Sequence, residues 1–319
     1  MLKPAVVIDS GSRFTRGGFA GQEQPQCVLR TVLVPSWHHR PAPESPGGWA
    51  AAPRSYPLKE KAAEVLFEGL GVPALHVANS GFLSLCAHGR VTGLAVEAGA
   101  AVCHVTPVCQ GRTLRKGARR LGVAGDHLSR YLHRLLRESP AGPRAPQALT
   151  ERVLTQLKER YCYVSLDYEG DLRDEGSRQP AGFQTPDGRW ITLGEERFCC
   201  PEPLFRPQLL QHSCPGLQQL AGQSLRALPE PLRRHVLGNI VLAGGSSMFP
   251  GFPERMCLEL NSLFQGDGVH VEVLANPKRG TAAWAGGSMA ASLTSFRHSW
   301  MTKDEYQEHG AQYVHTKFQ

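Results

Sequence analysis

The sequence predicts an α/β protein of two related halves that enclose a ligand-binding cleft. Two segments of the same design, 5–12 and 93–100, carry this prediction, because each runs from an apolar strand into a carboxylate, a small residue and a glycine. A second extended run follows each turn, at 17–20 and 101–105, which is typical of a β-hairpin. Facing each other across a cleft, the two acidic turns would clamp the phosphates of a nucleotide, with Mg²⁺ held through water.

A third turn of this kind lies in the segment 239–251, whose sequence is NIVLAGGSSMFPG. Its apolar run ends on Gly244 and Gly245, and a helical pattern follows at 252–264. Glycines lack a Cβ atom, so backbone amides at a helix entrance can approach an anion closely. An isolated glycine pair is more often an ordinary strand-to-helix turn. The two acidic turns elsewhere in the chain favour ligand binding here.

The elements between these turns alternate strands with helices, as α/β architecture requires. Residues 35–57 contain six prolines, which exclude a regular helix or a central strand and predict an irregular linker. An amphipathic helix is expected at 58–70, and a strand followed by the start of a helix at 73–85. Polar stretches with glycine or proline predict loops at 139–147 and 169–189.

The composition is that of a globular protein. Of 319 residues, 41% are hydrophobic and 20% are charged, and no apolar run reaches the length of a membrane span. Residues 1–4 lead directly into the first strand, which leaves no room for a signal peptide. Nine cysteines without a Cys-x-x-Cys pair predict reduced thiols in the cytosol or nucleus, and the histidines show no zinc-ligand spacing with them.

The chain is basic, with a net charge of +7 and a pI of about 9.0. A basic surface favours acidic partners, namely acidic proteins, membrane phosphoinositides or nucleic acid. Apolar residues recur at helical spacing from Leu128 to Leu136, so a solvated helix face is the alternative explanation for part of this charge. Much of the excess is carried by Arg112, Arg115, Lys116, Arg119, Arg120, Arg130, Arg134 and Arg137.

Beyond these patterns, the chain resembles actin and the actin-related proteins, within the superfamily of sugar kinases and Hsp70-type ATPases. It looks like one of the divergent, often testis-associated, actin-like proteins. The resemblance implies an actin-like ATPase-domain fold, with two related lobes around a nucleotide cleft. The segments that carry it lie in the family's order over nearly the whole chain, at 7–12, 18–21, 157–168, 197–205, 239–251, 284–288 and 300–306.

The resemblance also implies a domain organisation. The first lobe would comprise 1–34 and 58–110, and the second lobe, with the nucleotide cleft, 111–280. The C-terminal segment 281–319 would return to the first lobe. In actin the position of 35–57 holds a small inserted subdomain, whose flexible loop docks into the next protomer of the filament. That subdomain is expected to be missing from this chain.

Phosphate and metal binding would fall to the first acidic turn. Asp9, Gly11 and Ser12 match the family, with Asp9 as the residue that holds water-linked Mg²⁺. Arg16 stands in place of the phosphate-binding lysine. A guanidinium can hold phosphate, but it is bulkier than an ammonium, so the exchange is not neutral.

The second turn departs further from the family. Glu97 and Ala100 stand where the family has aspartates, and Ser80 stands where a glutamine orients the attacking water. Ala100 offers no oxygen to the water around the metal, and Ser80 is too short to orient the attacking water. His104 matches the family histidine near that water. Each of the two losses would slow hydrolysis roughly ten- to a thousandfold, so efficient catalysis is not expected.

The nucleoside side of the cleft is better preserved, although Gly280 replaces the lysine that packs against adenine. An exposed helical charge pair is the alternative interpretation of Lys158 and Glu159, and core packing is that of Met248. The residues that match the ribose, adenosine and base contacts of the family are Gly125, Lys158, Glu159, Gly244, Gly245, Ser246 and Met248.

These matches and departures predict a structural, cytoskeletal actin-like protein that is a subunit of a larger assembly and not an enzyme. It would bind ATP or ADP with Mg²⁺ weakly or not at all, and it would not form a filament of its own copies. Its expected partners are cytoskeletal or actin-binding proteins and acidic surfaces in the cytoplasm, without a membrane span or direct nucleic-acid contact. The alternatives are a slow ATPase of the sugar-kinase superfamily and a nuclear subunit of a chromatin-remodelling complex.

Overall fold

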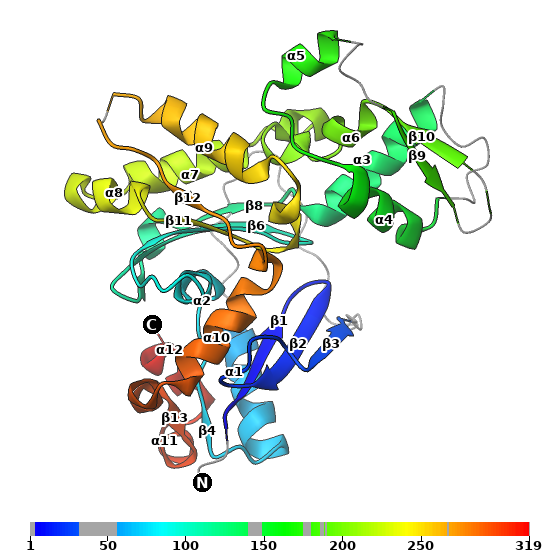
Figure 1. The fold of residues 1–319 in the computed structure, drawn as a ribbon. Coiled ribbons are helices and arrows are strands. Elements are labelled where there is room, and N and C mark those ends of the chain that lie inside the picture. Colours follow the sequence, from blue (N-terminus) through cyan, green and yellow to red (C-terminus); the bar gives the residue numbers. More distant parts are fainter. Residues whose placement is uncertain are drawn as a thin grey trace.

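Two lobes make up the molecule, and both chain ends lie in the lower one (Figure 1). The predicted linker 35–57 lies outside the described residues except for its last two positions, as does the predicted loop 139–147 except for Ser139. The computed structural model describes residues 4–31, 56–139, 149–174, 180–185, 188, 190–266 and 268–318.

The upper lobe is built on a sheet with the strand order β12-β11-β5-β6-β7, in which β8 also pairs with β6. Its two central neighbours, β11 and β5, run parallel, with Ala243 opposite Glu97. The second acidic turn and the glycine pair therefore follow the carboxyl ends of neighbouring parallel strands and lie at the same end of the sheet. The strands are β5 (Gly93–Ala98), β6 (Cys103–Cys109), β7 (Arg112–Thr113), β8 (Arg119–Leu121), β11 (Ile240–Ala243) and β12 (Val273–Leu274).

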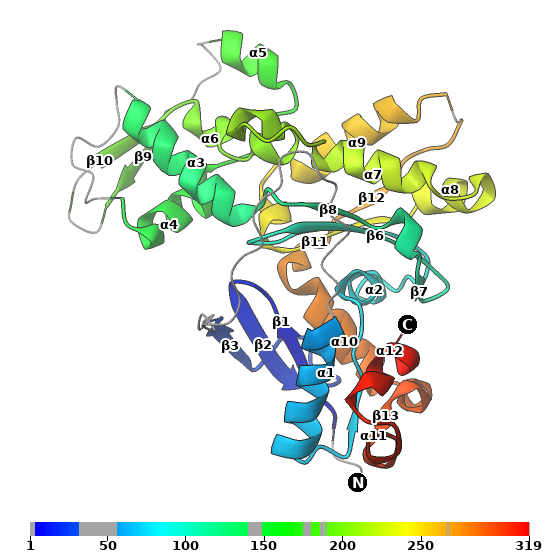
Figure 2. The same cartoon turned by 180° about the vertical axis from the view of Figure 1, so that it is seen from behind.

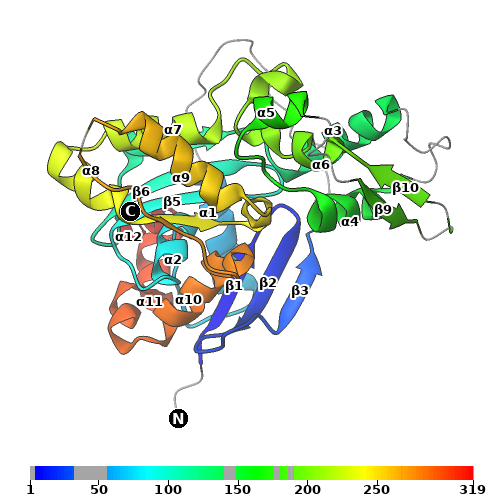
Figure 3. The same cartoon turned by 45° about the horizontal axis from the view of Figure 1, so that its top comes forward.

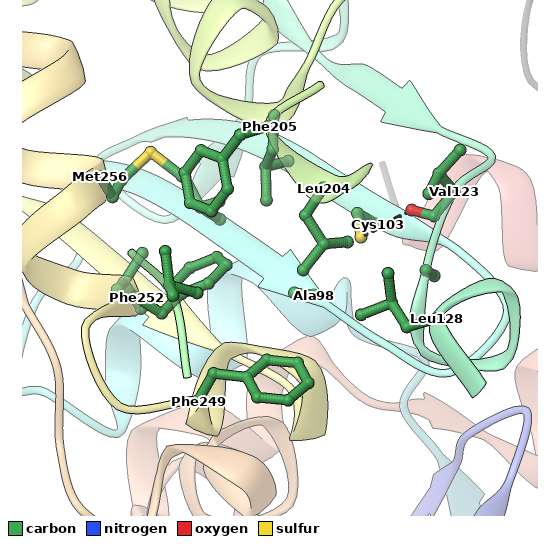
Figure 4. Packing of buried hydrophobic residues seen from close by; sticks show 14 of the residues in the cluster. Ala98, Cys103, Val123, Leu128, Leu204, Phe205, Phe249, Phe252 and Met256 are labelled. Atoms are coloured by element: carbon green, nitrogen blue, oxygen red, sulfur yellow. Dashed lines mark hydrogen bonds between the residues drawn. The ribbon is translucent and has the colours of Figure 1, made fainter. Parts of the chain in front are cut away.

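Helices cover both faces of this sheet, which explains why β5 and β11 read as continuous apolar runs. Figure 3 shows α7 and α9 over one face, and α2 lies against the other. In Figure 4, Phe252 and Met256 of α9 pack with Phe205, and the Cys103 thiol donates to Val123 O at 3.3 Å. These helices are α2 (Ser80–Cys86), α7 (Leu217–Arg226), α8 (Glu230–Leu237) and α9 (Phe252–Leu263).

A helical region extends the upper lobe beyond this sheet. The predicted apolar stripe of α3 is confirmed, because Leu128, Leu132 and Leu136 are fully buried. The prediction of a loop over 169–189 is wrong in part, since a helix and a strand form there. Asp167 caps that helix by accepting the N–H of Gly170. The elements are α3 (Gly125–Glu138), α4 (Glu151–Tyr161), α5 (Tyr168–Arg173), β9 (Ala181–Gln184), β10 (Trp190–Leu193) and α6 (Glu196–Cys199).

The lower lobe joins the two ends of the chain. A three-stranded antiparallel sheet, β1-β2-β3, lies beside α10 (Figure 2). The two are joined by a hydrogen bond from Trp284 Nε1 to Val7 O at 3.1 Å. Opposite that helix, Val6, Ile8 and Leu29 are exposed. The elements are β1 (Val6–Ser10), β2 (Phe14–Phe19), β3 (Cys27–Arg30), α1 (Tyr56–Glu64), a π-helix (Val65–Gly69), β4 (Ala74–Leu75), α10 (Ala282–Ser292), β13 (Met301–Thr302), α11 (Lys303–His309) and α12 (Val314–Lys317).

Strand pairing places residues 93–109 differently from the predicted boundary at residue 110. The sequence assigns them to the first lobe, whereas β5 and β6 pair with β11 and β8 in the upper lobe. The turn motif identifies the hairpin but not the partner strand, which lies more than a hundred residues further along the chain. Helix α10, in the predicted C-terminal segment, packs on β1 of the lower lobe and on α2.

Candidate nucleotide cleft

The first acidic turn joins β1 to β2 and carries Asp9, Gly11 and the exposed Ser12. Asp9 lies opposite Arg16 in the hairpin, and Arg16 Nη1 pairs with Asp9 Oδ2 at 3.2 Å. The N–H of Gly11 donates to Phe14 O, and a Cβ at Gly11 would lie 2.9 Å from that oxygen. The hairpin forms as predicted, and its carboxylate already has a partner within the protein.

In the second turn, both oxygens of Glu97 accept hydrogen bonds from α2. Ser80 Oγ donates to Oε2 at 2.9 Å, and Ser84 Oγ donates to Oε1 at 3.1 Å. Burial raises the pKa of Glu97 to about 7; the charge of Asp9 adds to this, while the two hydroxyls oppose it. The carboxyl is therefore only partly ionised at neutral pH. Two of the departures from the family, Ser80 and Glu97, thus contact each other.

His104 and Ala100 belong to the same β5–β6 hairpin as Glu97. His104 pairs with Glu97 across the β5–β6 hairpin. Burial, followed by the positive charge of Arg120, lowers the pKa of the imidazole, which keeps the ring neutral at pH 7. The carbonyl of Ala100 accepts the N–H of Asp126 at 2.8 Å. Ala100 therefore supports the start of α3 through its backbone and brings no side-chain oxygen to the cleft.

The second turn, the start of α3 and the glycine pair meet at Gly99. Its carbonyl accepts the N–H of Gly125 at 3.1 Å and the hydroxyl of Ser246 at 2.7 Å. A Cβ at Gly125 would lie 2.6 Å from that hydroxyl. A Cβ at Gly244 would lie 2.3 Å from Ala98 O, and Gly244 also has a φ of +88°. Both positions therefore require glycine for this junction to close.

Lys158 supports the same junction from α4. Its side chain is buried, and its ammonium donates to Gly125 O at 2.7 Å and to Ser129 Oγ at 2.8 Å. Burial lowers the pKa of this amine. The adjacent Glu159 is exposed. Lys158 thus ties α4 to the start of α3 through contacts within the protein.

The predicted base side of the cleft is formed by a 3₁₀ turn, Gly245–Met248. An added Cβ at Gly245 would meet no atom within 4 Å, and the side chain of Met248 is 40% exposed. Gly280 lies beside Met248, because a Cβ there would be 3.7 Å from Met248 Cγ. The neighbouring Arg279 does not replace the missing lysine, since its guanidinium is buried and donates to Ser247 O at 2.8 Å.

Arg13 is a residue at the cleft that the sequence analysis missed. It follows the first acidic turn in the lower lobe, and its Nη2 donates to Thr155 Oγ1 of α4 at 2.8 Å and to Glu151 Oε1 at 3.4 Å. Arg30 of β3 also pairs with Glu151, at 2.7 Å. The sequence signal for this residue is an arginine directly after a tight glycine turn. Its partners could not be predicted, because they lie 138 and 142 residues away. These contacts join the two lobes.

The side chains of the two turns do not fit a magnesium–nucleotide complex as the structure holds them. Oδ2 of Asp9 is paired with Arg16, and both oxygens of Glu97 accept serine hydroxyls. Within the described part of the chain, no three His, Cys, Asp or Glu side chains are grouped to hold a metal ion. Asp9 remains the predicted metal-binding residue.

A cavity of about 340 Å³ lies elsewhere, at the end of α4 and the start of α9. Its lining includes Arg160, Tyr163 and Arg197, and none of the residues predicted for nucleotide binding. The acidic turns and their carboxylates lie at the cleft and do not line this cavity.

Two α/β lobes with paired hairpin turns at their junction define the class of actin-like ATPase domains. A family model described as Actin matches residues 51–319. The chain belongs to the actin family. Its relatives include actin-like protein 9 of Mus musculus, 36% identical over 369 aligned positions that cover 98% of this chain and 88% of that protein. Actin-like protein 9 of Bos taurus and of Homo sapiens are 34% and 33% identical, with the same coverage.

Proposed function

We propose that this chain is a structural actin-like protein with a degenerate nucleotide cleft, and that it serves as a subunit of a larger assembly. The observation that carries the proposal is the state of the two cleft carboxylates. Asp9 is paired with Arg16, and both oxygens of Glu97 accept hydroxyls from Ser80 and Ser84. A metal-bound nucleotide would have to displace these partners before it could bind.

The remaining cleft residues support the same conclusion. Phosphoryl transfer depends on positioning and on charge stabilisation in the transition state. Ala100 supplies no carboxylate, and Ser80 supplies no amide to orient water. Arg13 and Arg30 link the lobes through α4. The two lobes are therefore joined by direct side-chain contacts at the cleft.

The lengths of the alignments with the relatives support the absence of the inserted subdomain. Alignments of at least 369 positions with a chain of 319 residues leave at least 50 positions of the relatives without a counterpart here. The family model begins its match at residue 51, just inside the proline-rich segment. We propose that the inserted subdomain is absent and that 35–57 replaces it.

The proposed partners are proteins, cytoskeletal or actin-binding ones included, and the proposed location is the cytoplasm and its cytoskeleton. Among the described helices, none combines the length and the apolar character of a membrane span. All nine cysteines are free thiols, as expected in a reducing compartment.

The purified protein is expected not to form filaments under conditions in which actin polymerises. A short linker rich in proline cannot build a small independent sheet, which needs several strands and an apolar face, so one side of the longitudinal contact would be lost. Sedimentation and electron microscopy in polymerising salt with Mg²⁺ and ATP measure this directly, with muscle actin as the parallel control. A monomer or a small fixed oligomer is the expected result, and long two-stranded filaments would refute the proposal.

A further inference from the structure

A strongly basic turn projects from the edge of the upper sheet. From residue 98 to residue 125 the chain contains no Asp or Glu but five Arg or Lys residues, all between 112 and 120. These residues lie on β7, β8 and the 3₁₀ turn Arg115–Gly117 between them. Arg115, Lys116 and Arg120 are exposed. No ion pair to any of the three is formed by the residues that the structure describes.

The turn that carries these charges is held firmly. Gly117 is buried, and a Cβ there would lie 2.7 Å from Pro107 Cγ and 3.5 Å from Ser224 O of α7. Leu114 N donates to Pro107 O at 2.8 Å. Arg119 Nη1 donates to the carbonyls of Lys116 and Ala118, each at 2.9 Å. The backbone is therefore fixed before any partner arrives, which reduces the entropy cost of binding.

Positive charge continues from this turn onto the lower lobe. Burial lowers the pKa of the Lys59 amine on α1, and the nearby positive charge of Arg115 lowers it further. The carboxylates next to Lys59 on α1 already have partners, since Glu60 accepts from His315 at 2.8 Å and Glu64 accepts from Lys61 at 2.6 Å. We define the inter-lobe basic surface as three exposed basic residues of the turn, Arg115, Lys116 and Arg120.

We propose that the inter-lobe basic surface binds an acidic, extended segment of a partner protein. Like charges gathered on one turn are complementary to an anionic partner, and such complementarity sets specificity and association rate. A protein segment fits better than single-stranded nucleic acid, because none of the residues that define the surface is an aromatic on which bases could stack. That this segment belongs to a partner in a larger assembly rests on the proposed function, whereas binding of an acidic peptide can be measured independently of that function.

Fluorescence anisotropy of a labelled oligoglutamate peptide, titrated with the full-length protein, tests the proposal. Saturable binding that weakens as salt is raised is the expected result. The variant Arg115→Glu with Lys116→Glu is expected to bind about tenfold more weakly or worse, because two attractions become repulsions. Arg173→Glu with Lys303→Glu changes the net charge equally at exposed sites on α5 and α11, and it is expected to bind like the parent.

Three outcomes would overturn the proposal. The first is a parent protein that does not bind the peptide saturably, and the second is equal weakening by the two charge-reversal variants. The third is tighter binding of oligouridylate or of phosphatidylserine vesicles than of the peptide, at the same salt concentration. Circular dichroism confirms that each variant is folded. The anisotropy titration measures peptide binding to the free protein. Its result therefore does not depend on whether the protein forms filaments or hydrolyses ATP.

Discussion

Gly244→Ala is expected to destabilise the protein by about 2–6 kcal/mol, the sum of a conformational and a packing cost. The residue has a φ of +88°, where an alanine costs roughly 1–3 kcal/mol. Its new Cβ would also lie 2.3 Å from Ala98 O, and overpacking against backbone adds roughly 1–3 kcal/mol. Urea denaturation followed by circular dichroism measures the loss, which is large against a total stability of roughly 5–15 kcal/mol.

The adjacent glycine supplies the control. Gly245→Ala adds a Cβ that meets no atom within 4 Å, so its stability should stay within about 0.5 kcal/mol of the parent. If the two variants were equally stable, the junction of β5, β11 and the second acidic turn would not be packed as described. A loss at both positions would instead point to a conformational requirement along the whole turn.

Arg255→Met should cost about 3–5 kcal/mol, because it removes the main partner of a buried carboxylate. Only Arg206 Nε, at 3.3 Å from Glu202 Oε1, would remain paired with it. Arg255 Nη2 pairs with Glu202 Oε1 at 3.2 Å, and Glu202 is fully buried. Burial, opposed chiefly by Arg255, raises the pKa of Glu202. Without the arginine that pKa rises further, so the folded state binds a proton that the unfolded state releases. The destabilisation should therefore grow as pH rises from about 4.5, the ordinary value, toward neutrality.

An exposed pair and a double variant isolate this effect. Arg234 pairs with Glu230 at 2.9 Å on the surface of α8, so Arg234→Met should cost no more than about 1 kcal/mol. Adding Glu202→Met to Arg255→Met should recover most of the stability, because no buried charge remains. Denaturation at pH 5 and pH 8 distinguishes the cases. An Arg255→Met loss independent of pH would mean that packing, and not the loss of the carboxylate's main partner, accounts for it.

The sequence predicted the elements that depend on local pattern. The two acidic hairpins, the glycine turn after β11 and the stripe of α3 all follow from short-range periodicity and glycine placement. The error over 169–189 has a local cause as well, since a polar composition concealed the cap at Asp167 and the buried Phe183. Strand partners could not be predicted, so 93–109 was assigned to the wrong lobe.

Most of the contacts within the cleft could not be predicted from the sequence. Ser80 and Glu97 were identified as separate departures from the family, but their hydrogen bond depends on how α2 packs against β5. The Ser246 hydroxyl reaches Gly99 O across 147 residues. Lys158 was predicted to face a nucleotide, while the structure directs its ammonium to Gly125 and Ser129. Such contacts follow from tertiary packing, which residue type and spacing do not encode on their own.

A titration of the purified protein with ATP and Mg²⁺, with hydrolysis followed in the same sample, tests the degenerate cleft most directly. Weak or undetectable binding and turnover below that of actin are expected, because Asp9 and Glu97 have protein partners and Ala100 and Ser80 lack the catalytic groups. Ala100→Asp combined with Ser80→Gln should raise any residual turnover by restoring a carboxylate and an amide. Tight binding with hydrolysis at the rate of actin would contradict the account.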